Sequence, residues 1–540
     1  MKNFGELSAE ESALLNDLVA SFHRSLWPFK QDRLRLELIE KLGHSRNVAL
    51  IPRLAPYTHN HDPKVCRAAV GSIERIMNSL PIAELPELDA LMRWDYLLYY
   101  GDEDWLKLSV SDFKTFSADR TQVALASMHP NGYVREAAVE VLASSKDEWP
   151  IPFLLLRTND WVAPIAHRVR KEIEARLRPE FSFKLLRCLP IVSRLERSGR
   201  FESKWLLDGI CELFASSDSV PLLREGLAAS HRDVRSLCLK ICSKLGADDE
   251  KKLLLEAYAT QSDGLTRTEI VGRLAVILEA NEYAGLFSKL IQDSFMPVRR
   301  EALHGRIQGG GSDVREILCG ALLDRHPSIR SFARFYLKSE MDFDAFYRDA
   351  VLTSRGRALA YAISGLGECG KKESASFLVP YLDVRETFSR KAAIAAIGRL
   401  DPATFREALF KMLGDDSPGA SRSAVLALKA VAHQLEVARI GLLLDDGRAY
   451  VRKNAIRLTA FQTKWNRLPL FLRACRDECE VNSKMAQAGL FTWHQRYNRD
   501  FSVPQPEQVS KAQLEAMWTR EWLSEPAYME IVDLLKSWTK

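Results

Sequence analysis

Apolar residues recur at helical spacing along almost the whole chain. They return every three or four positions in segments of roughly 10–18 residues, and short turns rich in Asp, Gly or Pro separate these segments. Sustained alternation of apolar and polar residues is absent, and no Asn-Gly turn joins two β-rich runs. The pattern therefore predicts an all-α protein.

The helical segments also resemble one another. Most carry a block in which Arg is followed three positions later by a small apolar residue, and the blocks are Val134–Ala138, Val234–Cys238, Val298–Ala302, Ile329–Ala333, Ser389–Ala393, Ser421–Val425 and Val451–Ala455. From Ala302 onward, with weaker copies at Ala362 and Met485 included, the blocks are spaced by 29 to 32 residues. A two-helix unit of this length leaves an apolar face uncovered, so we expect the units to stack.

The turns before these blocks have a shared chemistry. Asp precedes the Arg by six residues in four pairs, which are Asp293/Arg299, Asp324/Arg330, Asp416/Arg422 and Asp446/Arg452. Pro297, Pro327 and Pro418 lie in the same turns. Asp caps the N-terminus of a helix and Pro suits its first turn, so each turn ends one helix and begins the next.

The signature D-x-x-x-x-V-R-x-x-A resembles HEAT repeats, and above all the short HEAT-like repeats of phycobilin lyases. The resemblance is strong over residues 290–490, moderate over 120–290 and weaker over 1–120. It implies an α-solenoid of stacked two-helix repeats with a curved groove. It implies no single activity, because such arrays serve many functions.

The period predicts three regions. Residues 1–120 are expected to form an N-terminal helical cap with divergent repeats, 121–500 the HEAT-like array, and 501–540 a linker with capping helices. Pro504 and Pro506 mark the linker, after which Trp518, Trp522 and Trp538 are expected to dock on the last repeats.

Composition excludes several classes of protein. Hydrophobic residues make up 46% and charged residues 27% of the chain, which is typical of a soluble globular protein. No apolar run is long enough for a membrane span, and the first residues do not resemble a secretory signal. Nine scattered cysteines argue against a disulfide framework. We therefore expect a cytoplasmic protein without membrane contact.

Charge is small in total but uneven along the chain. The net charge is +5, which does not indicate a dedicated nucleic-acid binder. Residues 1–150 hold 17 basic and 22 acidic side chains, whereas residues 351–500 hold 24 basic and 15 acidic ones. The chain thus begins acidic and becomes basic in its later half.

The repeated arginines should lie one repeat apart and form a ladder. This arginine ladder comprises Arg135, Arg235, Arg299, Arg330, Arg390, Arg422 and Arg452. The row could clamp phosphates or carboxylates of a ligand. Alternatively, each Arg bonds a turn Asp or a helix end within the array, and the Asp six residues earlier favours this structural role.

Two stretches are candidate partner-binding surfaces. The first interleaves aromatic and acidic residues and contributes Trp94, Tyr96, Tyr99 and Trp105. It could dock a basic partner, or its rings could fill the core of a variant repeat. The second interleaves aromatic and basic residues and contributes Arg467, Arg473, Arg476, Trp493, Arg496 and Arg499. It could stack on bases or bind an acidic peptide, or it could be a solvated helix face above core aromatics.

Signals for catalysis, metals and cofactors are weak. Cys238/Cys242 and Cys475/Cys479 have i, i+4 spacing, but a buried free thiol explains each pair as well as zinc does. No His is followed by Glu, so the iron-binding His-Glu pairs of HEAT-like deoxyhypusine hydroxylases are missing. The Gly309–Gly311 turn lacks the Lys and Ser/Thr of a phosphate loop. We expect no cofactor and no catalytic residue.

Together these observations favour a non-catalytic scaffold or adaptor that binds a protein partner along the solenoid surface. The alternative is a nucleic-acid-binding solenoid that uses the basic later half, with chemistry like that of the HEAT-like alkylpurine DNA glycosylases. A role like that of the phycobilin lyases is a third option. The oligomeric state and the identity of the partner are left open by the sequence.

Overall fold

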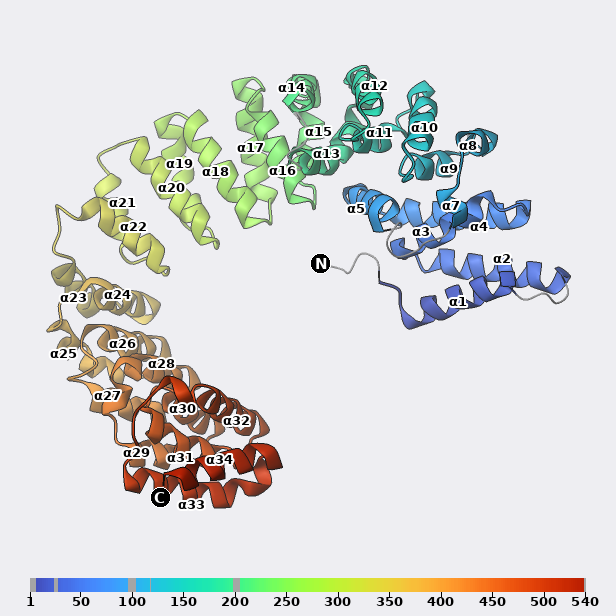
Figure 1. The fold of residues 1–540 in the computed structure, drawn as a ribbon. Helices are drawn as coiled ribbons and strands as arrows, with labels where there is room; N and C mark the ends of the chain where they lie inside the picture. Colours follow the sequence, from blue (N-terminus) through green and yellow to red (C-terminus); the bar gives the residue numbers. More distant parts are fainter. Residues whose placement is uncertain (1–5, 24–27, 96–102, 117, 198–203, 539–540) are drawn as a thin grey trace. The chain divides into compact units, whose positions relative to one another are not determined.

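The computed structural model describes residues 6–23, 28–95, 103–116, 118–197 and 204–538, and these residues are helical almost throughout. No β-strand occurs among them. The contacts between residues divide the chain into two compact units, residues 1–306 and 307–540. Each unit is described by itself below, and both are drawn in Figure 1. This division follows contacts, whereas the predicted boundaries at 120 and 500 follow the repeat period and stay predictions.

The first unit is a succession of short helices, and the last of them ends two residues beyond the boundary at residue 306. In chain order these are α1 (Ala9–His23), α2 (Pro28–His44), α3 (Ile51–Leu54), α4 (Pro63–Ser79), α5 (Leu85–Ala90), α7 (Glu103–Leu106), α8 (Val110–Phe116), α9 (Arg120–Ala126), α10 (Gly132–Ser144), α11 (Ile151–Arg157), α12 (Ala163–Glu174), α13 (Ser182–Arg197), α14 (Lys204–Leu213), α15 (Val220–Leu227), α16 (Arg232–Cys242), α17 (Ala247–Thr260), α18 (Gly264–Ile277), α19 (Ala280–Leu290) and α20 (Met296–Gln308). Neighbouring helices pack as pairs, among them α9/α10, α11/α12, α15/α16 and α17/α18.

The second unit repeats the same arrangement. Its helices are α21 (Val314–Ala321), α22 (Pro327–Leu337), α23 (Phe343–Thr353), α24 (Gly356–Cys369), α25 (Ser374–Leu378), α26 (Thr387–Leu400), α27 (Arg406–Lys411), α28 (Pro418–Leu428), α29 (Val437–Leu443), α30 (Ala449–Thr459), α31 (Lys464–Ala474), α32 (Glu480–Gln495), α33 (Pro506–Thr519) and α34 (Glu525–Ser537). The second helices of successive pairs, α24, α26, α28 and α30, stack on one another in that order. The predicted all-α solenoid of two-helix repeats is thus confirmed.

Turn chemistry sets the helix starts. The side chains of Asp62, Asp119 and Asp263 accept hydrogen bonds from backbone N–H groups in the first turns of α4, α9 and α18. Proline occupies the first position of α22 and α28, where its missing N–H costs no helical bond. Proline therefore acts in the turns as the sequence predicts. The predicted Asp caps are wrong by position, because His326, Ser417 and Arg448 are the N-caps of α22, α28 and α30.

The stacked helices of the second unit approach closely through glycine and alanine. A Cβ atom added to Gly398 would lie 2.6 Å from the Cα atom of Ala427, and one added to Gly367 would lie 2.5 Å from that of Ala396. Each glycine therefore allows α24 to meet α26, and α26 to meet α28, at backbone distance. Ala393, in the same layer of α26, is completely buried.

We expect Ala393→Leu to lower the free energy of unfolding by about 1–3 kcal/mol, because the added methylene groups have no space between tightly packed helices. Urea denaturation followed by circular dichroism measures the change. Ala358→Leu on α24 is the matched control, since Ala358 is exposed, and it should leave the transition unaltered. An unchanged transition for Ala393→Leu would mean that the layer has room to spare.

Candidate partner-binding site

Six of the seven predicted ladder arginines share one setting near the start of the second helix of a pair. In each, Nη1 donates a hydrogen bond to the backbone carbonyl six residues earlier, and in five of them also to the carbonyl five residues earlier; the six are Arg135, Arg235, Arg299, Arg330, Arg390 and Arg452. Five are buried and Arg390 is half-buried. Each guanidinium thus fixes the turn that precedes its own helix.

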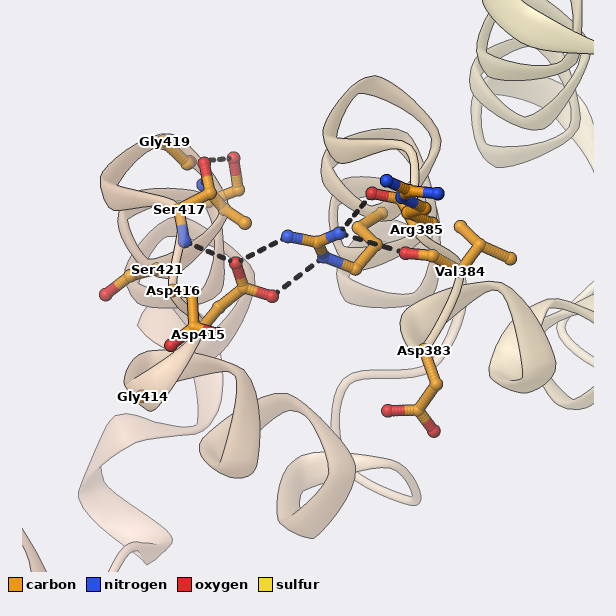
Figure 2. Close-up of polar contacts among 12 residues, drawn as sticks. Asp383, Val384, Arg385, Gly414, Asp415, Asp416, Ser417, Gly419 and Ser421 are labelled. Atoms are coloured by element: carbon orange, nitrogen blue, oxygen red, sulfur yellow. Dashed lines mark hydrogen bonds and ion pairs between the residues drawn. The ribbon is translucent and has the colours of Figure 1, made fainter.

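The other edge of the guanidinium reaches the next repeat. Nε and Nη2 of Arg390 donate to the two carboxylate oxygens of Asp415 at 2.9 and 3.0 Å. Figure 2 shows that carboxylate together with the Val384 and Arg385 carbonyls that also accept from this side chain. Arg135 makes the same bidentate pair with Asp160, and Arg452 with Asp477. A bidentate pair of this kind is both strong and geometrically specific.

The prediction for Arg422 is wrong by one residue. Arg422 is exposed, and the position six residues after Asp415 belongs to the buried Ser421, whose hydroxyl donates to the Leu413 carbonyl. The expected partner Asp416 is fully exposed and receives its bond from Arg448. Because Asp415 and Asp416 are adjacent, the six-residue spacing fits either Asp415 with Ser421 or Asp416 with Arg422. In the structure, Ser421 occupies the ladder position.

A further ladder member was missed in the sequence. Arg267 donates to both carboxylate oxygens of Asp293 at 2.8 and 2.9 Å and to the carbonyls of Gln261 and Ser262. It lies midway between Arg235 and Arg299, so the period alone could have found it. The block was not recognised because Ile270 replaces the small residue three positions later.

Arg330 shows what happens when the carboxylate is missing. The position 25 residues later, which holds Asp in most repeats, is Arg355. Arg330 forms its ion pair with Glu368 of α24 instead. The guanidinium groups of the ladder thus form their bonds with carboxylates and carbonyls of the array itself.

Arg135 also belongs to a buried ion cluster of three arginines and two aspartates in the first unit. Asp160 accepts from Arg135 at 2.9 Å and from Arg157 at 3.2 Å, and Arg93 lies between Asp89 and Asp160. Arg157 also pairs with Asp89. Burial alone would raise the pKa of Asp160, but the hydrogen bonds and charge of the arginines hold that pKa below its ordinary value.

The first predicted docking surface is only partly within the described residues. Tyr96, Tyr99 and the side chain of Trp94 lie outside them. Trp105 is buried, and its ring centroid lies 5.5 Å from that of His59 and 4.9 Å from that of His129. Trp105 is therefore a core residue, and its assignment to a partner-binding surface is wrong.

The second predicted surface separates into several environments. Arg473 pairs with Asp445, whereas Arg476 pairs with Glu515 and lies 5.3 Å from the ring centroid of Trp518. Arg499 is exposed in the short helix η10 (Tyr497–Arg499). The remaining three residues, Arg467, Trp493 and Arg496, line one cavity of about 370 Å³.

This cavity, which we call the basic cavity, lies against α31 and α32. Its lining consists of Ala460, Lys464, Arg467, Phe471, Ala488, Gly489, Thr492, Trp493, Arg496 and Asp500. A Cβ atom at Gly489 would lie 2.6 Å from the ring of Phe471, so only glycine lets this ring and α32 meet. Phe471 and Trp493 form apolar walls, and the charged side chains face the same space.

An aromatic core supports the basic cavity. The ring centroid of Trp465 lies 5.9 Å from that of Trp493 and 5.5 Å from that of Trp538 in α34's C-cap. Trp493 is buried, and its Nε1 donates to the Lys464 carbonyl at 2.7 Å. Trp493 is therefore a buried, fixed wall of the cavity and not an exposed ring of the kind that stacks on a base.

Three cations meet a single carboxylate in the basic cavity. The buried Lys464 donates through Nζ to the backbone carbonyls of Tyr497 and Asp500 at 2.9 and 2.6 Å. Burial lowers the pKa of Lys464 and that of Arg467, and the nearby Arg496 adds to the effect on Arg467. A bound anion would reverse both effects, because it favours the charged forms.

Arg467 is the cation best placed for a ligand. Its Nε donates to the Gln462 carbonyl, and among the described residues its two terminal nitrogens have no hydrogen-bond acceptor. The pKa of Asp500 lies below its ordinary value, chiefly because Ser502 donates hydrogen bonds to the carboxylate and also because Lys464 and Arg467 place positive charge nearby. Asp500 is therefore ionised. A carboxylate of such low basicity is a poor general base, so the arrangement is suited to binding an anionic group.

The remaining chemical groups are dispersed. Within the part of the chain that the structure describes, no three His, Cys, Asp or Glu side chains gather in a way that could hold a metal ion. Cys238 and Cys242 lie in the first unit and Cys475 and Cys479 in the second, and burial raises the pKa of Cys242 and Cys475 to about 12. No described helix has both the length and the apolar character needed to cross a membrane.

No protein-family model and no curated protein sequence matches the chain. Among solved structures, yeast importin-β matches 98% of this chain and 67% of its own at 11% identity, with a TM-score of 0.39. A second importin-β structure covers 97% of this chain and 81% of its own at 12% identity, with a TM-score of 0.40. The tumor overexpressed gene (TOG) domain arrays of microtubule polymerases cover 76% of this chain and 99% of their own at 12% identity, with a TM-score of 0.24.

These low scores identify no function and no partner. The assignment of the fold depends on the chain itself: two-helix units, Asp- and Pro-capped turns, and guanidinium bridges from one repeat to the next. On these features, the chain is an α-solenoid of HEAT-like repeats.

Proposed function

We propose that the protein is a non-catalytic scaffold that binds a protein partner along its solenoid surface, and that the basic cavity receives an acidic side chain of that partner. The observation that carries the proposal is the free edge of Arg467, which faces a cavity with three cations and one carboxylate. A carboxylate can accept both terminal N–H groups of a guanidinium at once, which makes this pairing specific.

Apolar surface beside the basic cavity favours a protein over a nucleic acid. Phe491 and Phe501, which adjoin the lining residues Thr492 and Asp500 in sequence, are 62% and 91% exposed. Exposed aromatic side chains and Arg are both typical of the anchor residues in protein interfaces. A backbone-binding groove for nucleic acid would instead need a continuous row of free cations, whereas Arg473 and Arg476 are already paired with carboxylates.

The double charge reversal Arg467→Glu/Arg496→Glu should therefore weaken binding of the protein partner at least about tenfold, since two cations near one anion are lost. Tagged full-length protein captures the partner from its native cells, and the affinity of the purified complex is then measured. Arg399→Glu is the control, because Arg399 is exposed on α26 and does not line the cavity.

Two results would contradict the proposal. One is a partner that binds the double variant as tightly as the native chain. The other is tight, saturable binding of fluorescent oligonucleotides at about 150 mM salt that the double variant loses, since this would assign the cavity to nucleic acid. Circular dichroism of the double variant establishes that it is folded.

A further inference from the structure

The first unit contains a second cavity, of about 560 Å³, with an apolar floor and a basic rim. Side chains from α4, α5, α9, α11 and α13 line it, together with Trp149. The floor includes the buried residues Leu80, Leu85, Ala124 and Phe153. We call it the amphipathic cavity, and none of its lining residues was among the sequence-based candidates.

Trp149 and Phe153 form its aromatic wall. Their ring centroids lie 6.0 Å apart, with the rings inclined at 59°. The guanidinium of Arg120 lies 5.2 Å from the Trp149 ring centroid and forms an ion pair with Asp147. The wall is thereby held in place from the side of α9, and it offers flat apolar area at little cost in side-chain entropy.

The rim carries more positive than negative charge. Arg120 contributes from α9, and Lys184 and Arg187 contribute from one face of α13 because they are three residues apart on that helix. Glu74 is the only carboxylate among the described lining residues. Among the described residues, neither Lys184 nor Arg187 forms an ion pair with a carboxylate, and both contribute to the positive environment of the buried Cys188.

We propose that the amphipathic cavity is a docking site for a segment of a partner protein in which one large apolar side chain is flanked by acidic residues. The apolar side chain would bury against Phe153 and Leu85, which removes apolar surface from water on both molecules. Carboxylates beside it would meet Lys184 and Arg187, the rim cations that have no carboxylate partner among the described residues. The volume of about 560 Å³ lies within the usual range of ligand-binding clefts.

This site is independent of the basic cavity, because different residues in different units line the two. The two also differ in chemistry. The basic cavity offers a guanidinium for one anionic group, whereas the amphipathic cavity needs both an apolar anchor and flanking negative charge.

Fluorescence anisotropy with the full chain tests the proposal. The probe is a fluorescein-labelled peptide with the sequence Gly-Ser-Glu-Asp-Phe-Asp-Glu-Ser-Gly. Two companion peptides replace Phe by Ser, or all four acidic residues by Lys. We expect saturable binding of the probe, at least fivefold weaker binding of the Ser peptide, and no binding of the Lys peptide.

Variants assign the binding to the cavity. Lys184→Glu/Arg187→Glu should weaken binding of the probe at least tenfold, and the milder Lys184→Gln/Arg187→Gln should show an intermediate loss. Lys240→Glu is the matched control, since Lys240 is exposed on α16 and does not line the cavity. Arg467→Glu/Arg496→Glu should bind the probe like the native chain, which separates this proposal from the one made for the basic cavity.

Several outcomes would overturn the proposal. The probe could fail to bind. The Ser peptide could bind as tightly as the probe, which would mean that charge alone determines binding. The Lys184 and Arg187 variants could bind the probe as the native chain does. A single-stranded oligonucleotide could displace the probe with the same dependence on Lys184 and Arg187, which would assign the cavity to nucleic acid.

Discussion

Asp160→Asn should lower the stability of the first unit by about 3–5 kcal/mol, which is the usual cost of removing one partner from a buried ion pair. The substitution keeps the shape of the side chain, and among the described residues it leaves Asp89 as the only carboxylate in the cluster with Arg93, Arg135 and Arg157. Arg135 and Arg157 are completely buried, so water does not compensate the lost charge. Thermal and urea unfolding, followed by circular dichroism, measure the effect.

Asp147→Asn provides the comparison, because Asp147 forms its ion pair with Arg120 on the exposed surface, where such pairs contribute little. That variant should unfold within about 1 kcal/mol of the native chain. If Asp160→Asn were equally mild, the three guanidinium groups would have to be stabilised by something other than the carboxylate of Asp160.

Acidification should destabilise the same unit through His129. This imidazole is completely buried, accepts a hydrogen bond from the N–H of Asn131 at Nδ1, and donates from Nε2 to the Trp105 carbonyl. Burial lowers the pKa of His129 to about 4, and the nearby Arg135 contributes to this shift. A proton at Nδ1 would abolish the bond from Asn131, so the folded chain resists protonation.

The unfolded chain takes up this proton near pH 6.5, whereas the folded chain does so only near pH 4. The stability from neutral His129 is therefore fully present above pH 6.5 and is lost progressively as the pH falls toward 4, by about 3 kcal/mol in total. Urea midpoints measured between pH 7 and pH 4 give the slope. His129→Gln should flatten that slope, and an equally steep loss in this variant would place its origin in other groups.

The repeat period carried most of the information about the fold. Each unit of about 30 residues must bury one face against the next, so the spacing of Arg299, Arg330 and Arg390 reports helix pairs even without homologues. The period does not determine which of two adjacent residues occupies a given position of the repeat. Adjacent aspartates at 415 and 416 satisfied the same spacing rule, and only packing distinguishes the exposed Arg422 from the buried Ser421.

The candidate sites were harder to predict for a physical reason. A cavity collects side chains from several helices, so its members are separated by tens of residues and leave no local pattern. Arg467 and Arg496 were found because the basic residues cluster within one repeat. Lys184 and Phe153 were not, because Lys184 fits an ordinary amphipathic helix and Phe153 belongs to an apolar helix that is buried throughout. The error for Trp105 was the opposite one. Its acidic neighbours in the sequence suggested a surface residue, but its ring is buried in the core.

The replacement of an arginine by Ser421 makes the second unit mechanically uneven. Charged bridges clamp α26 to the turn of α28 and α30 to the turn of α32, through Arg390–Asp415 and Arg452–Asp477. Between α28 and α30 this bidentate bridge is missing, because Asp446 is occupied by Arg448 of its own turn. A neutral bond from Asn454 to Ser421 and an ion pair of Arg448 with the fully exposed Asp416 join the two repeats instead. Neutral bonds are about half as strong as charge-assisted ones. An exposed ion pair also contributes less than a buried bidentate one, so under tension along the array we expect this joint to extend before its neighbours.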